Sequence, residues 1–503
     1  MKIAYFLDVP VKIGGAGNLL IQQAGLMAEL YDVIVVIPTD ENGNPNPEYK
    51  KRCIRLHLAY AGLQFYTFYN FMNIDYMAVM NSVPCIEEFA RKENITFFHS
   101  VQLNPAVEYV SRKLKIPHLM NIYQLQKSEF KLCPGDVYAQ YHMCDSKMYS
   151  ELWRQEAGVS SKCVRPIAIR EEIKRKAVYP TDKLRFLMLG DICERKNQLT
   201  AIQAVEQCLA TKDLELHLAG YLDSDYAREC MVYVESHKLE AKVVFHDFVE
   251  DITPLLEKCD CLLCTSTDES FPSSMVEAVS YDMTIISTPV AGVPELFIDG
   301  YNSFVSDNFT VESIRDCILK CVRHYADGEI VNIHENAQKT WQENFAKKTV
   351  RQQIDLYYSE VRSDKHFKGL DIFHDVEKEV KNTERMLGSV KSEGEEWIYT
   401  RSLYFTLLRE RFRGGKIYIW GAGKLGKLMA EILQKIVGDV EIMAFIDTYR
   451  EGLCCGIPII KPNETPMNKK FIYCIGYLHN NVKAVHYLEE RGLKLNEQIW
   501  KSC

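Results

Sequence analysis

The sequence predicts an α/β protein built from two parallel, doubly wound units and a smaller third unit. Short apolar runs of strand length alternate with amphipathic helical patterns through most of the chain, which is typical of parallel sheets covered by helices. The alternation restarts after residues 165–183, a stretch rich in Lys and Arg that we expect to be a linker. A separate pattern of strand, glycine turn and helix begins at Lys416.

The first unit is expected to span residues 1–165. A glycine-rich turn, Gly14-Gly15-Ala16-Gly17, joins its first strand to its first helix, as tight connections of this kind require. The strands are predicted at 2–7, 33–37, 96–100 and 118–122, and the helices at 19–30 and 106–115.

The second unit is expected to span residues 166–339, and a long helix over 340–362 is expected to return to the first unit. Two such halves facing a cleft hold a ligand at the carboxyl ends of their strands. The strands of this unit are predicted at 184–189, 214–219, 243–245, 261–264 and 284–287, and the helices at 199–209, 226–237, 252–258 and 275–280.

Residues 363–412 are polar and charge-rich and are expected to form a helical linker, and residues 413–503 form the third unit. Its Gly421-Ala-Gly423-Lys-Leu-Gly426 turn lies between a strand and a helix, and Asp447 ends the next strand, which is the context of a dinucleotide-binding motif. Only about 90 residues are available, roughly one mononucleotide-binding half. The strands are predicted at 416–420, 442–446 and 471–475, and the helices at 428–436 and 482–491.

Composition excludes several classes of protein. The chain of 503 residues is 47% hydrophobic and 25% charged, as in ordinary globular proteins, and its net charge of -8 argues against a nucleic-acid binder. No apolar run approaches the roughly 18 residues of a membrane-spanning helix. The short N-terminal apolar run does not resemble a signal peptide, and 17 cysteines without an export signal suggest a reducing cytoplasm. Cys261 and Cys264 have metal-ligand spacing but lie in an apolar strand, so we expect buried thiols.

The segment from Glu269 to Glu277, Glu-Ser-Phe-Pro-Ser-Ser-Met-Val-Glu, is the most informative about function. It follows an apolar strand and leads into a helix, so one carboxylate lies in the loop and the other inside the helix. A helix N-terminus suits a phosphate, whereas carboxylates suit sugar hydroxyls. The segment therefore predicts a nucleotide-sugar site.

Over about residues 1–360 the chain resembles the GT-B glycosyltransferases of family 4, also called group 1. The resemblance implies a GT-B fold, two Rossmann-like domains facing a cleft, with a nucleotide-sugar donor of unspecified base and no required metal or cofactor. It is carried by the segment Glu269 to Glu277, by Thr-Pro-Val-Ala-Gly-Val-Pro-Glu-Leu-Phe-Ile-Asp-Gly over 288–300, by the turn at Gly14, by the loop 190–197 and by Val-Val-Phe-His-Asp-Phe-Val over 243–249.

The resemblance assigns the donor diphosphate to Lys196, with Arg195 as a helper, because a cation stabilises the charge that grows on a leaving diphosphate. A solvated surface Lys is the alternative. The family usually has Arg after the glycine of this loop, whereas this chain has Asp191, and it has Asp247 where the family has glycine. Asp191 would repel a diphosphate, so donor binding is expected to be altered or supported by another cation.

By the same resemblance, Glu277 would hold the donor ribose and Glu269 the transferred sugar. A helix-first-turn acid stabilised by the dipole is the alternative for Glu277. The sugar and phosphates would also meet the segment Phe271, Pro272, Ser273 and Ser274, and the turn at Gly14 and Gly15 would approach the phosphates from the first domain.

His99 is expected to end a strand of the first unit and is the third candidate catalytic residue, after Glu269 and Lys196, because family members have a catalytic His in this region. It would contact the sugar or share the acceptor proton, with a purely structural His as the alternative. The Asp223-Ser-Asp225 sequence matches a metal-binding pattern of another glycosyltransferase fold, but a polar turn is favoured.

The resemblance implies a retaining hexosyltransferase of a bacterial cytoplasm that moves a sugar to a glycan or lipid-linked acceptor in cell-envelope polysaccharide synthesis. The basic stretch from Lys162 to Arg185 leaves peripheral contact with the inner face of the membrane open, and the oligomeric state is not predicted. Two alternatives remain: a catalytically decayed nucleotide-sugar-binding or scaffolding protein, which Asp191 favours, and a glycoside hydrolase using two carboxylates.

The third unit resembles the small Rossmann-like domain of bacterial sugar acyltransferases, which binds a nucleotide-sugar. Gly421, Gly423, Gly426 and Asp447 would line such a site. Binding of a second nucleotide-sugar, binding of a dinucleotide, and a packing domain without ligand are the three interpretations.

Overall fold

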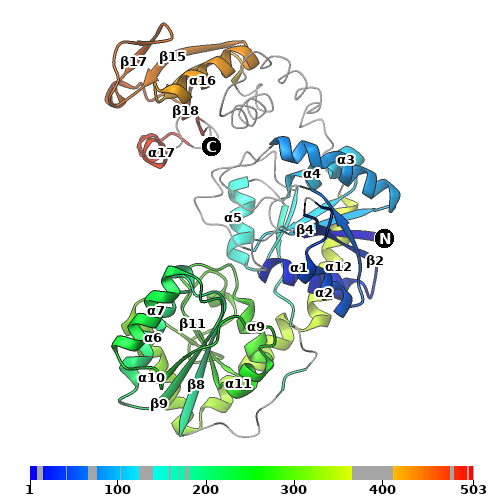
Figure 1. Ribbon diagram of the computed structural model, residues 1–503, viewed down its shortest axis with the longest axis vertical. Helices are drawn as coiled ribbons and strands as arrows, with labels where there is room; N and C mark the ends of the chain where they lie inside the picture. The colour runs from blue at the N-terminus through cyan, green and yellow to red at the C-terminus, as the bar shows by residue number, and fades with distance from the viewer. Residues whose placement is uncertain are drawn as a thin grey trace.

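Figure 1 shows the protein as a computed structural model. The structure describes residues 1–7, 15–40, 42–65, 76–101, 104–123, 140–157, 160–168, 170, 172–174, 176, 179, 182–364, 412–475, 481–494 and 498–501. The predicted helical linker at 363–412 and Gly14 therefore lie almost wholly outside the described residues.

The first unit contains a seven-stranded sheet in the order β3-β2-β1-β4-β5-β6-β7, with all neighbouring strands parallel. The four strands that the apolar runs predicted are confirmed, and β3, β6 and β7 are additional because polar or small residues interrupt their apolar pattern. The strands are β1 (Lys2–Phe6), β2 (Asp32–Pro38), β3 (Ala59–Leu63), β4 (Phe97–Val101), β5 (His118–Asn121), β6 (Tyr141–Cys144) and β7 (Ser160–Cys163). The helices are α1 (Gly15–Met27), α2 (Pro47–Arg55), α3 (Tyr76–Lys92), α4 (Pro105–Leu114) and α5 (Lys147–Ala157).

The second unit contains a six-stranded parallel sheet in the order β10-β9-β8-β11-β12-β13. Its first five strands in chain order are those predicted. They are β8 (Lys183–Leu189), β9 (Asp213–Ala219), β10 (Val243–Phe245), β11 (Cys261–Cys264) and β12 (Thr284–Ser287), followed by β13 (Phe304–Val305). The helices are α6 (Gln198–Cys208), α7 (Asp225–Ser236), α8 (Thr253–Lys258), α9 (Ser273–Ser280), α10 (Val311–Asp327) and α11 (Ile330–Asn344).

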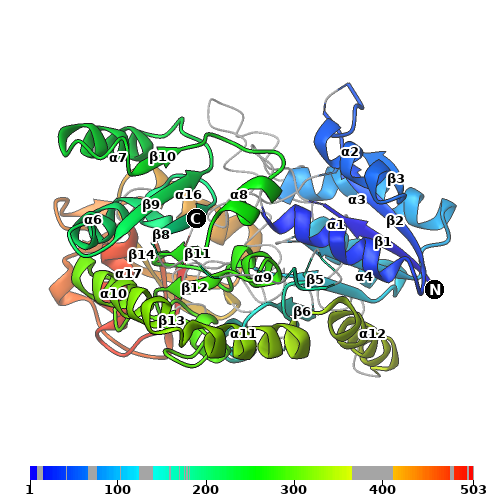
Figure 2. The same cartoon turned by 90° about the horizontal axis from the view of Figure 1, so that it is seen from below.

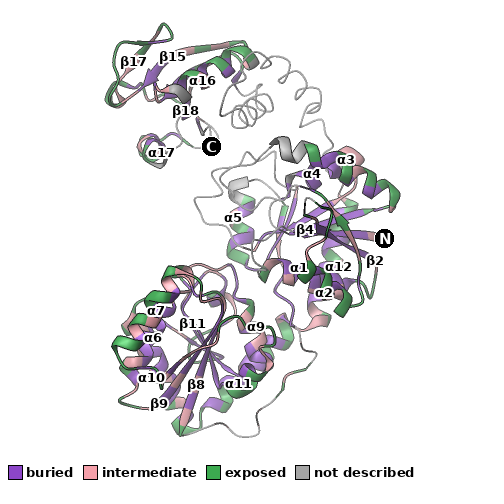
Figure 3. Cartoon of the chain, in the orientation of Figure 1, coloured by how far each residue is buried: buried purple, intermediate pink, exposed green. Residues whose placement is uncertain are grey.

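Burial explains the layering of both units. Buried residues concentrate in the strands and on the helix sides that face them (Figure 3), because removing apolar surface from water drives the packing. In two views α9 lies on the side of the second unit that is nearest the first (Figures 1 and 2).

The prediction of a single helix over 340–362 is wrong, because two helices cover this stretch. The helix α11 ends at Asn344 and α12 spans Lys347–Ser363. Ala346 has extended backbone angles, φ -58° and ψ 139°, and Phe345 before it is fully buried against Phe271 and Phe297. Burying Phe345 in the second unit interrupts the helix there. The helix α12 then packs its buried face into the core of the first unit, as a returning helix.

The third unit contains a six-stranded sheet in the order β16-β17-β15-β14-β18-β19. Its three predicted strands and two predicted helices are present, and a π-helical turn at Leu433–Val437 extends the first helix. The elements are β14 (Gly415–Trp420), α16 (Lys424–Ile432), β15 (Val440–Ile446), β16 (Leu453–Cys454), β17 (Ile457–Ile460), β18 (Phe471–Ile475), α17 (Asn481–Glu489) and β19 (Ile499–Lys501). None of the helices in the described ranges combines the length and the hydropathy that crossing a lipid bilayer requires.

Candidate active site

The candidate site lies at the carboxyl ends of β8 and β11, where two loops of the second unit meet. The loop after β8 turns at Gly190, whose φ of +125° is open to glycine but strained for other residues. A short 3-10 helix, Glu194–Lys196, then carries the two candidate cations. The Gln198 side chain closes this loop by donating to the Asp191 carbonyl (2.9 Å) and accepting from the Cys193 N–H (3.2 Å).

The loop after β11 holds the cation loop in place through Thr265. The Thr265 hydroxyl contacts the carbonyls of Lys196 (3.0 Å) and Asn197 (2.9 Å), and the Thr267 N–H donates to the Arg195 carbonyl (2.9 Å). Two loops from different strands are thereby fixed to each other, so their side chains are presented in a defined arrangement.

Three groups converge on one oxygen of Glu269. Its Oε1 lies 2.5 Å from Lys196 Nζ and 2.6 Å from Arg195 Nη1, and it accepts a bond from Ser266 Oγ at 3.3 Å. Burial by itself would raise the pKa of Glu269, but the charges of Lys196 and Arg195 outweigh burial and lower the pKa of Glu269. Glu269 is therefore an anion held between two cations.

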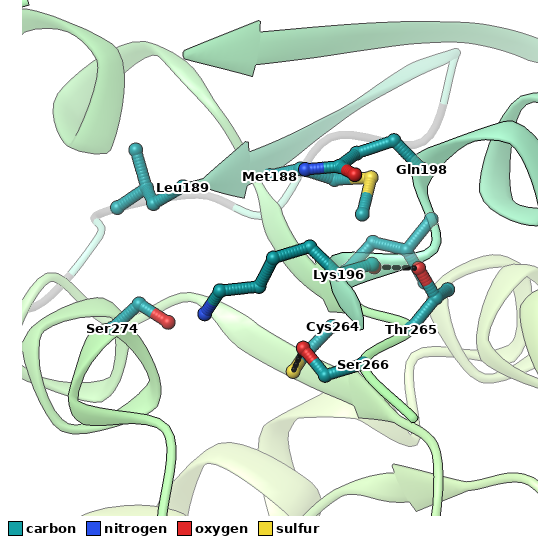
Figure 4. A pocket seen from close by; sticks show the side chains of 9 residues that line it. Met188, Leu189, Lys196, Gln198, Cys264, Thr265, Ser266 and Ser274 are labelled. Carbon is teal, nitrogen blue, oxygen red and sulfur yellow. Dashed lines mark hydrogen bonds between the residues drawn. The ribbon is translucent and has the colours of Figure 1, made fainter. Parts of the chain in front are cut away.

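A small pocket opens beside this cluster, and the Lys196 side chain runs along it towards the side on which Ser274 lies (Figure 4). Ser273 and Ser274 are the first two residues of α9, so their free N–H groups lie at its N-terminus. The pocket is lined by Met188, Leu189, Lys196, Gln198, Leu263, Cys264, Thr265, Ser266 and Ser274. A cation and a helix N-terminus on one pocket are what binding of a phosphate requires.

The remaining residues of the Glu269 segment have different environments. The Phe271 ring is buried (4% exposed) under the Arg165 guanidinium, 5.3 Å from its centroid, so this side chain packs in the core. Pro272 is the residue that precedes α9. Glu277 is the fifth residue of α9, beyond the first turn, so the alternative of a first-turn acid is wrong. Burial raises the pKa of the partly buried Glu277 to about 7.

His99 is the third residue of the five in β4, and the expectation that it ends a strand is wrong. It is fully buried, with Nδ1 2.5 Å from the Tyr358 hydroxyl and Nε2 2.7 Å from Asn121 Oδ1. The Asn121 amide in turn donates to Gln23 Oε1 (2.6 Å) and to the Tyr123 hydroxyl (2.5 Å). Burial lowers the pKa of His99 to about 3, so the ring is neutral and links α12 to the end of β5.

The remaining candidates of the first unit and of the loops lie at the protein surface. Gly15 is the exposed first residue of α1, with open space around its Cα. Asp191 is exposed directly after Gly190, at the position where the resemblance expects Arg. Asp247 is exposed after β10, and its carbonyl accepts from the Gly220 N–H (3.2 Å).

We expected a structural role for two sequence patterns, Asp223-Ser-Asp225 and the pair Cys261 and Cys264. Ser224 caps α7 by accepting from the Ala227 N–H (3.0 Å), and Asp225 is almost fully exposed and pairs with Arg228. Cys261 and Cys264 are buried free thiols of β11.

Sequence reasoning missed a set of contacts between the two units. Asp145, directly after β6, accepts a hydrogen bond from Ser270 Oγ. The Glu295 carboxylate accepts from the N–H groups of Lys147 (3.0 Å) and Met148 (2.9 Å), and Arg165 Nη2 lies 2.5 Å from it. These residues lie far apart in sequence, and local pattern gives no indication that they meet.

The glycine turn of the third unit is closed by its own acidic residue. Asp447 accepts the N–H groups of Ala422 (2.9 Å), Tyr449 (2.9 Å) and Arg450 (3.0 Å), which outweigh the effect of burial and lower the pKa of Asp447. A Cβ on Gly426 would lie 1.7 Å from the Gly421 carbonyl oxygen, so the third glycine allows close packing of helix and strand. Gly423 directly precedes α16.

Comparison with known proteins agrees with this architecture. Residues 169–340, about a third of the chain, match the family model "Glycosyl transferases group 1", so the predicted resemblance to group 1 glycosyltransferases is confirmed for that stretch. An uncharacterized glycosyltransferase of Methanocaldococcus jannaschii is 23% identical over 293 residues, 55% of this chain and 77% of that protein. The GPI3 subunit of phosphatidylinositol N-acetylglucosaminyltransferase from Saccharomyces cerevisiae is 28% identical over 144 residues, 27% of this chain and 30% of that protein.

Solved structures share the fold of the first two units. A glycosyltransferase from Rickettsia africae has a TM-score of 0.59 at 16% identity, covering 72% of this chain and 100% of its own. Anabaena HepE in complex with UDP-glucose has a TM-score of 0.59 at 19% identity, covering 71% of this chain and 99% of its own. The predicted GT-B fold, with a third α/β unit after it, is thereby confirmed.

Proposed function

We propose that this protein is a glycosyltransferase of family 4 that moves a hexosyl group from a nucleotide-sugar to an acceptor with retention of configuration and without a metal ion. The observation that carries the proposal is the convergence of Lys196 and Arg195 on Glu269 beside the N-terminus of α9. The family match of residues 169–340 covers this cluster.

Each residue of the cluster has a task in this proposal. Lys196 moves from Glu269 to the donor diphosphate and stabilises the charge that grows on it as the glycosidic bond breaks. The N–H groups at Ser273 and Ser274 bind the same phosphates. Glu269 Oε1 stays with Arg195, and its other oxygen accepts a hydroxyl of the transferred sugar.

Two further residues complete the donor site. Glu277 accepts the ribose hydroxyls, and its partly buried position suits it to a neutral ligand group. His99 acts from a distance, since it bonds Asn121, and Asn121 donates to the Tyr123 hydroxyl at the carboxyl edge of the first sheet. Gly15, the exposed first residue of α1, lets the backbone approach the phosphates from the first unit.

The acceptor and the cellular place are part of the same proposal. We propose a glycan or lipid-linked glycan of the cell envelope, used at the cytoplasmic face of the membrane. Support comes from similar proteins: yeast GPI3 belongs to a phosphatidylinositol N-acetylglucosaminyltransferase, and WaaG, a fold neighbour at 12% identity, is involved in lipopolysaccharide biosynthesis.

The competing functions are less well supported. A glycoside hydrolase needs one acid of raised pKa and one ionised carboxylate, and the pKa values of Glu277 and Glu269 are shifted in these two directions, so a hydrolase is disfavoured by the match of residues 169–340 to a glycosyltransferase family model. A decayed protein is the second candidate, because Asp191 places an exposed carboxylate beside the phosphate loop. For the third unit we propose a second nucleotide-sugar site rather than a dinucleotide site. In a dinucleotide site the acidic residue accepts a ribose hydroxyl. An ionised Asp offers about four acceptor positions, and Asp447 already uses three of them for backbone N–H groups.

The test is a thermal-shift screen of nucleoside diphosphates and nucleotide-sugars on the full chain, with UDP-glucose as the first probe. Binding should raise the melting temperature, and Lys196→Ala and Glu277→Ala should remove the shift. Release of nucleoside diphosphate then separates an active enzyme from a decayed one. A folded chain that responds to no nucleotide contradicts the proposal.

A further inference from the structure

We propose that Asp145 is a positioning residue of the transferase site: acting through Ser270, it holds the loop that carries Glu269 against the first unit. The inference rests on the proposed function for the role of Glu269. Asp145 lies at the carboxyl edge of the first sheet, after β6, and belongs to the opposite unit from Glu269.

The contact is buried and specific. Asp145 is 3% exposed and Ser270 is 1% exposed, and Ser270 Oγ donates to Asp145 Oδ1. Ser270 Oγ also lies 3.1 Å from Ser146 Oγ. Because Ser270 is the residue after Glu269, its position fixes the backbone that carries the Glu269 carboxylate.

The residue on the other side of Glu269 is held in the same way. The Tyr149 hydroxyl of α5 donates to Asp268 Oδ1 at 3.1 Å, and Arg195 Nη1 donates to the Asp268 carbonyl at 3.1 Å. Both neighbours of Glu269 in the chain are thus bonded to residues of the first unit, Tyr149 and Asp145. Glu269 therefore moves relative to the first unit only when these bonds break.

Close packing keeps the two units in this register. The Gly292 N–H donates to the Ser270 carbonyl at 3.0 Å, and a Cβ on Gly292 would lie 2.7 Å from both Ser146 Cβ and that carbonyl oxygen. Glu295, three residues further on, accepts the two N–H groups at the start of α5. A carboxylate at a helix N-terminus is favourable, so this contact also stabilises the packing of the two units against each other.

Burial of Asp145 favours its neutral form. Burial is the main cause that raises the pKa of Asp145 to about 8, the Ser270 hydrogen bond opposes it, and Glu269 adds to it. A protonated Asp145 bonds Ser270 without placing a second anion beside Glu269. The titratable and charged groups around it are Tyr123, Cys144, Tyr149, Cys163, Arg165 and Glu269.

The experiment compares Asp145→Ala, Asp145→Asn and Glu250→Gln in the full chain. Asn keeps the shape of the protonated acid. Glu250→Gln is the matched control, because Glu250 makes an exposed ion pair with Lys51 of the first unit that does not touch the Glu269 loop. Release of UDP from UDP-glucose gives kcat and KM, and hydrogen exchange of residues 265–272 reports on the loop without turnover.

We expect Asp145→Ala to lower kcat about 100-fold with little change in KM, since small misplacements of catalytic groups cost that much. Hydrogen exchange of residues 265–272 should rise while that of β8 to β12 stays the same. Asp145→Asn should rescue most of kcat and remove any loss of activity that the wild type shows as pH rises through about 8. Glu250→Gln should behave as wild type.

An unchanged loop exchange in Asp145→Ala overturns the proposal, as does an Asn variant as impaired as the Ala variant. If Asp145→Ala does not fold, Ser270→Ala removes the same hydrogen bond with a smaller change, and the same two readouts decide. A wild type that releases no nucleoside diphosphate from any nucleotide-sugar of the screen, but whose loop loosens in Asp145→Ala, contradicts the proposed function and supports the positioning role. The two failures are thus distinguishable.

Discussion

Replacing Lys196 by Met, beside a matched Arg195→Met variant, tests which cation serves the donor diphosphate. Both side chains contact the same oxygen of Glu269, at 2.5 Å for Lys196 Nζ and 2.6 Å for Arg195 Nη1, and both side chains are mostly buried, 18% and 33% exposed. Each variant removes one cation and keeps an apolar stem, so the structural damage should be similar.

The expected loss of stability follows from the shared carboxylate. Breaking a buried ion pair completely costs about 3–5 kcal/mol. Because one cation remains on Glu269 in either variant, we expect about half of that loss, about 2 kcal/mol, which for a unit of this size lowers the melting temperature by about 4–8 °C. Scanning calorimetry of the unliganded chain measures it.

The catalytic effects should differ. Lys196 lies on the pocket, whereas Arg195 also donates to the Asp268 carbonyl, so only Lys196 is placed to move to the donor. Losing a group that stabilises developing charge costs about 100- to 1,000-fold in kcat. We expect that loss for Lys196→Met and about tenfold or less for Arg195→Met. Equal losses in both variants, or unchanged UDP binding with unchanged kcat in Lys196→Met, would refute the assignment.

Three further predictions concern single residues. Glu277 has its pKa raised to about 7 in the fold, so its contribution to stability should be present at acid pH and fall as pH rises through about 7; Glu277→Gln should remove this slope in pH-dependent melting curves, and an unchanged slope would contradict the burial argument. Gly292→Ala should lower the free energy of unfolding by about 1–3 kcal/mol through overpacking, because its Cβ would lie 2.7 Å from Ser146 Cβ. A chemical-unfolding midpoint equal to that of the wild type would show that Gly292 packs loosely against Ser146. His99, whose pKa is lowered to about 3, should contribute stability at neutral pH that is lost as pH falls below about 6.5; a His99→Asn variant with the same acid unfolding curve as wild type would show that another group controls it.

Local sequence patterns predicted most of the strands that position the site. The runs at 243–245, 261–264 and 284–287 coincide with β10, β11 and β12, because strands of a parallel sheet covered by helices are mostly apolar. The strands β6 and β7 were missed, since Tyr-His-Met-Cys and Ser-Ser-Lys-Cys carry polar residues where such a run is expected. The break at Ala346 was missed because the anchoring of Phe345 in the second unit is a tertiary contact.

The sequence by itself determined the fold class, the order of loop and helix around Glu269 and Glu277, and the presence of two cations after β8, because periodicity and chemical type are local properties of the chain. Only the tertiary structure decided that Lys196 and Arg195 share one oxygen of Glu269, that His99 is enclosed in the sheet, and that Asp145 bonds Ser270 across the two units. The contacts of Arg195 with Glu269 and of Asp145 with Ser270 join residues 74 and 125 positions apart, and such distances in space are set by how the sheets and helices pack.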